Sequence, residues 1–246
     1  MTMTVELWWT ERGSGAPFVL LHPGGSDARA LEPLLDALGD GYRLITPEQR
    51  AHGHTPDAGE LSFDAMADDT VAFIESLGVG AVHLLGYSDG AIVALYVALA
   101  RPDLVTDLVF AAAPTTVEGW HGGVLGVEPP ESMADAYAEV SPDGRDHWPV
   151  VVEKMAQMHA DGPHVDDARL RGLTTPTFIV LGDDDQVRLE HAVDVYLTLP
   201  NGELAVIPRS THGFLVEKPG LFARIVREFH ADHSSVGVAP LRRRPW

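Results

Sequence analysis

Apolar residues along this chain follow two patterns, short continuous runs and longer segments. The short runs are rich in Val, Leu and Ile and predict strands buried on both faces, at residues 17–22, 42–46, 81–85, 107–113, 176–181 and 203–207. The longer segments predict helices between them, at residues 27–38, 63–77, 91–100, 189–199 and 219–230. This alternation predicts an α/β fold with a mostly parallel twisted sheet flanked by helices.

The beginning and the middle of the chain depart from the alternation. Residues 5–9 are expected to form an edge strand. Residues 115–174 are rich in Gly, Pro, Met, His and acidic residues, and short helices are predicted around 131–140, 148–160 and 165–171. A connection of this length within a compact domain is seldom structureless. We therefore expect a single domain over residues 1–246, with a helical cap inserted at 115–174 and a mobile tail at 231–246.

Composition and charge narrow the classes of function. The chain has 17 Lys and Arg residues against 36 Asp and Glu residues, a net charge of −19. Such a charge repels nucleic acids and anionic membranes, so a small neutral or cationic molecule is the expected partner. The absence of cysteine excludes disulfides and thiol catalysis. We expect a cytoplasmic protein, because the sequence has neither a signal-like segment nor an apolar run that could span a membrane.

The sequence Gly86-Tyr87-Ser88-Asp89-Gly90 lies between a predicted buried strand and a predicted buried helix. Side chains at Gly86 or Gly90 would collide with a backbone that turns sharply at Ser88. Such a turn places the serine hydroxyl beside the helix N-terminus, where unpaired N–H groups and the helix dipole stabilise an anion. The pattern is typical of a nucleophilic serine.

With this strand, turn and helix, the chain resembles the α/β-hydrolase family over nearly all of residues 5–230. The resemblance implies an α/β-hydrolase fold and the catalytic order serine, acid, histidine. Ser88 would be the nucleophile and His212, after the last strand, its general base. The family's Gly-x-x-Asp pattern selects Asp185 to orient the histidine, with Asp183 as the second choice.

The family also implies an oxyanion hole. The turn after the first central strand usually supplies one backbone N–H, and because Pro23 has none, we expect Gly24 to be the donor together with Asp89. The elbow is similar to that of valacyclovir-hydrolase-type esterases, in which the aspartate engages a substrate amine. This similarity implies an Asp89 carboxylate at the mouth of the site. Trp120 and Trp148 are candidate walls of the substrate pocket.

Several other polar residues are interpreted as structural. His52 and His54 lie in a loop that resembles the family's Asp-x-Arg-Gly-His-Gly-x-Ser segment, and no acidic or histidine partner for a metal is identifiable. The run 183–185 lacks the spaced oxygen ligands of a calcium loop. Acidic residues early in helix 63–77 are expected to complement its dipole, namely Asp64, Asp68 and Asp69. We therefore expect no metal and no cofactor.

The expected activity is hydrolysis of a small ester, thioester, lactone or activated amide through an acyl-enzyme. A lyase, a C–C bond hydrolase or a perhydrolase with the same triad is one alternative. A ligand receptor of the same fold, without catalysis, is the other.

Overall fold

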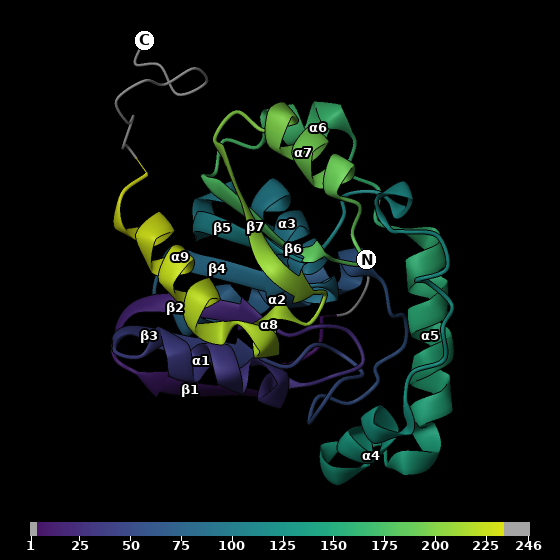
Figure 1. The fold of residues 1–246 in the computed structure, drawn as a ribbon. Coiled ribbons are helices and arrows are strands. Elements are labelled where there is room, and N and C mark those ends of the chain that lie inside the picture. Colours follow the sequence, from purple (N-terminus) through teal and green to yellow (C-terminus); the bar gives the residue numbers. More distant parts are fainter. Residues whose placement is uncertain (1–3, 234–246) are drawn as a thin grey trace.

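Within residues 4–233, which the computed structural model describes, a seven-stranded sheet forms the centre of the molecule (Figure 1). The strand order is β1-β3-β2-β4-β5-β6-β7, with β1 antiparallel to β3 and all other neighbours parallel. The strands are β1 (Trp9–Gly13), β2 (Gly15–Leu21), β3 (Gly41–Pro47), β4 (Val82–Tyr87), β5 (Val105–Ala111), β6 (Thr177–Asp184) and β7 (Gly202–Thr211). This architecture confirms the predicted α/β fold with a mostly parallel sheet.

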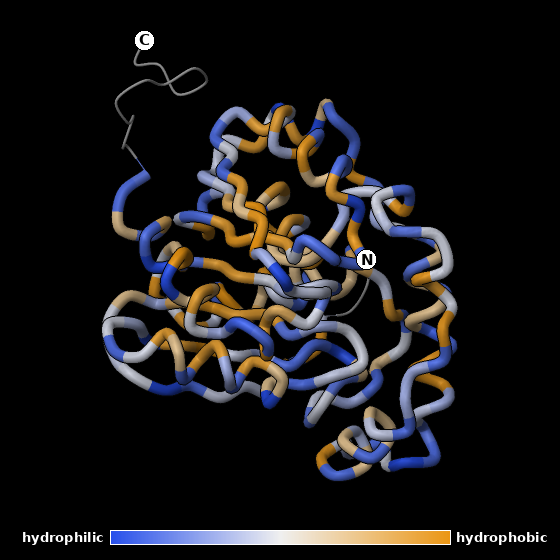
Figure 2. The backbone as a smooth tube through the Cα atoms, in the orientation of Figure 1, coloured by the Kyte–Doolittle hydropathy of each residue, from blue (hydrophilic) through white to orange (hydrophobic). Residues whose placement is uncertain are grey.

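Helices cover both faces of the sheet (Figure 1). One face carries α1 (Glu32–Leu38), α8 (Phe214–Glu217) and α9 (Pro219–Ala231), and the other carries α2 (Phe63–Leu77) and α3 (Asp89–Ala100). Helix α3 is buried from Asp89 to Ala98, which explains its almost wholly apolar sequence. The inner strands are correspondingly hydrophobic and the outer loops hydrophilic (Figure 2).

The remaining α-helices lie between β5 and β7 in the chain. They are α4 (Glu131–Val140), α5 (Trp148–Asp161), α6 (Asp167–Gly172) and α7 (Leu189–Thr198), with 3-10 turns at η1 (Ala28–Leu31), η2 (Pro102–Leu104), η3 (Val117–Gly119) and η4 (Arg145–His147). Helix α5 stands beside the sheet with α4 at its end (Figure 1). We call the segment 115–174 the cap segment. Of the tail expected at 231–246, residues 234–246 lie outside the described residues.

None of the helices found in residues 4–233 is both long and apolar enough to cross a lipid bilayer.

The first strand is not where the sequence predicted it. Residues 5–9 were expected to pair, but β1 occupies Trp9–Gly13 instead. The backbone N–H groups of Val5 and Trp8 donate to the side chains of Asp69 and Thr55, at 2.7 and 3.0 Å. Side chains of the neighbouring elements therefore take the donors that a strand would have used.

The last strand is longer than predicted. We expected it to end at residue 207, but β7 continues to Thr211, and the short helix α8 that follows was not expected at all. β7 is an edge strand that pairs only with β6. The missing N–H of Pro208 therefore breaks no hydrogen bonds to a second neighbouring strand, and β7 continues past this residue. His212 is consequently the first residue after the strand.

Asp69 is a buried ion-pair partner, which corrects its interpretation as a dipole-complementing residue. Its two carboxylate oxygens accept hydrogen bonds from Nε and Nη2 of Arg50, at 2.6 and 2.8 Å. Both side chains are buried, 1% exposed for Arg50 and 0% for Asp69. This bidentate pair joins the loop after β3 to α2.

Candidate active site

The turn from β4 into α3 has the tight geometry that its glycines predicted. Ser88 adopts φ 55° and ψ −123°, a conformation that non-glycine residues seldom occupy. A Cβ on Gly86 would lie 2.1 Å from the carbonyl oxygen of Gly90, and one on Gly90 would lie 2.5 Å from that of His22. Both contacts are too close for a real side chain, so glycine is required at both positions to place Ser88 at the start of α3.

The structure brings Ser88, His212 and Asp185 together at the carboxyl ends of the parallel strands. His212 Nε2 lies 3.0 Å from Ser88 Oγ, and His212 Nδ1 lies 2.8 Å from Asp185 Oδ1. The hydroxyl of Tyr87 donates to the backbone oxygen of His212 at 2.6 Å, which fixes the loop that carries the imidazole. The side chain of His212 is 21% exposed, whereas that of Asp185 is fully buried.

Asp185 is held by three donors. Oδ2 accepts the N–H of Gly182 at 2.9 Å, and Oδ1 accepts the N–H of Val187 at 3.2 Å in addition to the imidazole of His212. Burial alone would raise the pKa of Asp185, but these hydrogen bonds outweigh it and hold the pKa below its usual value. Because the ionised carboxylate only accepts, His212 carries its proton on Nδ1 and presents the lone pair of Nε2 to Ser88.

The second-choice acid, Asp183, lies elsewhere. Its side chain is exposed, and Oδ1 accepts the N–H of Ser210 at 3.0 Å. Within the described residues, the structure thus joins Asp185 and not Asp183 to the histidine.

The loop that contains Gly24 is held in place by His22. His22 Nε2 accepts the N–H of Gln49 at 3.0 Å, so Nδ1 carries the proton and donates to the oxygen of Pro23 at 2.9 Å. Burial lowers the pKa of His22 to about 4, which keeps this imidazole neutral. The loop lies directly against the start of α3, because a Cβ on Gly24 would stand 1.9 Å from Oδ2 of Asp89. The Gly24 loop therefore packs against the side chain of Asp89.

Asp89 lines the cavity above Ser88, but its side chain is already paired with a histidine of the cap segment. Its carboxylate is 5% exposed, and both oxygens lie 2.9 Å from Nε2 of His159, which belongs to α5 of the cap segment. The charge of Asp89 raises the pKa of His159 despite its burial. Burial would raise the pKa of Asp89, but the charge on His159 and its hydrogen bond lower it. This ion pair fastens the cap segment to the elbow.

We expect the substitution His159→Ala to lower the free energy of unfolding by about 2–3 kcal/mol near pH 6, because it leaves a buried carboxylate without its cation. Since Asp89 raises the pKa of His159, the pair is fully stabilising below the ordinary imidazole value of 6.5 and weakens as pH rises through the raised pKa. The difference from the unsubstituted protein should therefore shrink in urea titrations repeated at pH 9.

His147→Ala is the matched control for that experiment. His147 lies 2.8 Å from Asp57, but Asp57 also binds Lys154 at 2.5 Å and keeps a cation after the substitution. We expect a loss below about 1 kcal/mol for this control. Equal losses in both variants would show that the Asp89–His159 pair has no special role.

A cavity of about 560 Å³ opens above Ser88 and His212. Its apolar walls include Trp120, Met133 and Met155. The ring of Trp120 meets that of His212 edge to face, with centroids 5.8 Å apart. Trp120 thus lies where the sequence placed it, at the wall of the pocket.

Trp148 does not line this cavity, which corrects the second candidate wall residue. It is the first residue of α5, is 8% exposed, and packs against Tyr137 of α4 with ring centroids 5.2 Å apart. Part of its ring is used for packing between α4 and α5, and Cη2 reaches the Gly25 loop, 3.6 Å from where a Cβ on that glycine would lie.

The loop histidines make structural contacts. His54 Nδ1 lies 2.9 Å from Oε2 of Glu48, and its ring stacks on Trp8 at 3.8 Å between centroids. Glu48 is a partner of His54 that the sequence did not identify, and the contact fits the structural interpretation of this loop. His52 is buried and its Nδ1 contacts the backbone oxygen of Arg50 at 2.8 Å. Neither histidine belongs to a cluster of three metal-ligating side chains within the described residues.

Known proteins resemble this chain in sequence and fold. It is 29% identical over 123 residues to a pimeloyl-acyl-carrier protein methyl ester esterase of Aliivibrio salmonicida, an alignment that covers 49% of this chain and 46% of that esterase. It is 26% identical over 223 residues to an sn-1-specific diacylglycerol lipase of Mus musculus, covering 78% of this chain and 72% of the lipase. The first alignment thus spans less than half of the esterase.

A solved structure of a meta-cleavage product hydrolase from Pseudomonas fluorescens IP01 superposes with a TM-score of 0.76 and 23% identity, covering 92% of this chain and 94% of that one. At this identity the likeness concerns the fold alone. The sequence model of the alpha/beta hydrolase family matches residues 18–225, which is most of the chain. Together with the sheet and the elbow, this match establishes that the chain belongs to the alpha/beta hydrolase family.

Proposed function

We propose that this protein is a cofactor-independent serine hydrolase that cleaves a small ester, thioester, lactone or activated amide through an acyl-enzyme. The observation that carries the proposal is the hydrogen-bonded series from Ser88 Oγ to His212 and on to Asp185, at 3.0 and 2.8 Å. A serine hydroxyl is a weak nucleophile until a base takes its proton, and this series supplies that base in the required tautomer. Family membership and the similar esterase and lipase support the same class.

In the acylation step, Ser88 Oγ attacks the carbonyl carbon of the substrate while His212 Nε2 takes the hydroxyl proton. The carbonyl oxygen becomes an oxyanion, and Asp185 stabilises the imidazolium that has formed. When the tetrahedral intermediate collapses, His212 gives the proton to the leaving alcohol, thiol or amine. The acyl group stays on Ser88 as an ester.

In the deacylation step, a water molecule attacks the acyl carbon while His212 takes one of its protons. The second tetrahedral intermediate collapses to the carboxylic acid, and His212 returns the proton to Ser88 Oγ. The enzyme is then restored without any redox change.

The oxyanion would accept hydrogen bonds from the backbone N–H groups of Gly24 and Asp89. Asp89 is the first residue of α3, where N–H groups have no acceptor within the helix and the helix dipole is positive. The contacts of His22 with Pro23 and Gln49 hold the Gly24 loop in place before any substrate binds. Such preorganised donors commonly supply about a hundredfold to a thousandfold of the rate each.

The cavity favours an uncharged acyl or alcohol group. Trp120, Met133 and Met155 offer apolar contact beside Ser88. A substrate amine would have to share the carboxylate of Asp89 with His159, which already contacts both of its oxygens. We therefore favour neutral esters over aminoacyl esters, against the implication of the valacyclovir-hydrolase-like elbow.

Labelling with a fluorophosphonate tests the proposal, because this probe phosphonylates an activated serine. We expect one label per chain, and the substitution Ser88→Ala should abolish labelling together with hydrolysis of nitrophenyl esters. Ser26→Ala is the matched control: Ser26 also lines the cavity, but its hydroxyl donates to the oxygen of Pro23 at 2.6 Å. A label that survives Ser88→Ala would exclude Ser88 as the nucleophile, and tight ligand binding without labelling would favour a receptor.

A further inference from the structure

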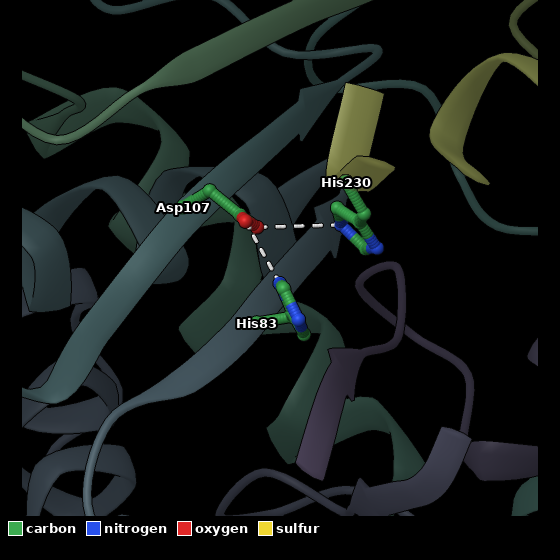
Figure 3. Close-up of side chains that lie close together, drawn as sticks. All are labelled: His83, Asp107 and His230. Carbon is green, nitrogen blue, oxygen red and sulfur yellow. Dashed lines mark hydrogen bonds and ion pairs between the residues drawn. The ribbon is translucent and has the colours of Figure 1, made fainter. Parts of the chain in front are cut away.

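A cluster of histidines surrounds Asp107 near the beginnings of β4 and β5, at the opposite end of these strands from Ser88. His83 is the second residue of β4 and Asp107 the third of β5, and the two are paired in the strand register. His230, near the end of α9, approaches from the helix that covers this part of the sheet (Figure 3). Since Ser88 follows the carboxyl end of β4, the cluster is separate from the proposed catalytic site.

The ligand atoms of this cluster converge. His83 Nδ1 lies 2.7 Å from Oδ2 of Asp107, and His230 Nε2 lies 3.3 Å from Oδ1 (Figure 3). These three ligand groups lie within 4.8 Å of one another. His233 Nε2 lies 2.9 Å from Oδ2 of Asp107 but is not part of this mutually close group, so it would have to move toward the other nitrogens to act as a fourth ligand.

The cluster contains an unsatisfied contact between two buried atoms. The side chain of Asp107 is fully buried and that of His230 is 4% exposed. Within the described residues, neither Asp107 Oδ1 nor His230 Nε2 has a hydrogen-bond partner, although the two atoms face each other. Buried polar atoms are rarely left in this state, and a cation bound between them would satisfy both.

The ring of His230 is held by a neighbour outside the cluster. The hydroxyl of Tyr42 lies 3.1 Å from His230 Nδ1, the kind of outer contact that orients a ligating histidine.

We propose that His83, Asp107 and His230, with His233 as fourth ligand, bind a divalent transition-metal ion, with zinc as the best match. Imidazole nitrogens and one carboxylate oxygen form a donor set typical of zinc, whereas calcium and magnesium prefer oxygen ligands. Zinc bonds of about 2.0–2.2 Å place tetrahedral ligand atoms roughly 3.3 Å apart, so His83 and Asp107 need to separate by only about half an ångström. Four protein ligands leave no open position, and the ion would be structural, joining α9 to β4 and β5.

Zinc titration of the full chain, after treatment with a chelator, tests this site. Calorimetry should give one high-affinity zinc ion per chain, and at a free zinc concentration about 100 times Kd the Tm should rise by about 5–10 °C. Cobalt chloride should bind at the same place and give the intense visible absorption of a tetrahedral complex. His83→Gln and His230→Gln should each weaken zinc binding at least about a hundredfold and remove the Tm shift.

Two further variants keep the test decisive. His233→Gln changes a ligand that is 27% exposed, so the chain should fold normally while zinc affinity falls by at least about tenfold. His121→Gln is the matched control, because His121 is exposed and outside the cluster, and it should leave the binding unchanged. Absence of zinc binding, or binding that survives all three cluster substitutions, would overturn the proposal and leave a hydrogen-bonded network around Asp107. Ester hydrolysis is a separate readout, so failure here would not affect the proposed function.

Discussion

Replacing His212 by glutamine should lower kcat/KM for an activated ester by about 10⁵–10⁶-fold. Nε2 of His212 is the nitrogen that faces Ser88 Oγ at 3.0 Å, and the amide of glutamine cannot take a proton from a hydroxyl. Binding and the oxyanion hole would still act, so a residual acceleration of about 10³–10⁴ over the uncatalysed reaction should survive. Stopped-flow and steady-state kinetics with nitrophenyl esters of increasing acyl length measure both the loss in kcat/KM and the residual acceleration.

The control for this substitution is His54→Gln. His54 stacks on Trp8 and contacts Glu48 outside the cavity, so kcat/KM should change by no more than about threefold. His212→Gln should also keep its fold, because the contact from Tyr87 reaches the backbone oxygen of residue 212 and not the ring. A loss below about a hundredfold in a folded His212→Gln variant would mean that another group serves as the base.

The positions of Ser88 and His212 were predictable because each is fixed by local sequence. Two glycines around Ser88 permit one sharp turn, and parallel strands bring their carboxyl ends to one edge of the sheet. His212 therefore had to lie near Ser88 once both were placed after strands. Asp185 was selected by the Gly-x-x-Asp pattern of the family that the chain resembles, and the structure adds what the pattern did not contain, the two backbone donors that hold it.

Contacts between distant elements were not predictable in the same way. The pairing of Asp89 with His159 joins residues 70 positions apart, and no local pattern marks a helix histidine as the partner of an elbow aspartate. Trp148 was assigned to the pocket by residue type alone, but the packing of α4 on α5 decides where its ring lies. The strand expected at residues 5–9 failed because Asp69 and Thr55 compete for its backbone donors.

The cluster around Asp107 is a further example of this limit. His83 and Asp107 are 24 residues apart and His230 comes from the last helix, so their spacing matches no metal-binding motif. Only the strand register and the docking of α9 bring them together. Tertiary structure is therefore the first level at which this site can be recognised.

Replacing Asp185 by asparagine should lower kcat by about 10⁴-fold, although the two side chains have nearly the same shape. Asp185 accepts from three donors, the N–H groups of Gly182 and Val187 and the imidazole of His212. An amide has one oxygen, so its NH2 group must face at least one of these donors. If it faces His212, the imidazole turns to the tautomer with the proton on Nε2 and can no longer accept the proton of Ser88.

Asp183→Asn is the matched control, because Asp183 is two residues away but exposed, and kcat should stay within about threefold. Stability gives an independent readout. Since the pKa of Asp185 is lowered in the folded protein, its charge stabilises the fold above the ordinary carboxyl pKa of about 3.9, and this contribution is lost as pH falls through the lowered value. The difference in the free energy of unfolding between the protein and Asp185→Asn should therefore be full at pH 7 and shrink below about pH 4. Equal loss of activity in both variants would contradict the assignment of Asp185, because of these two aspartates only Asp185 contacts His212.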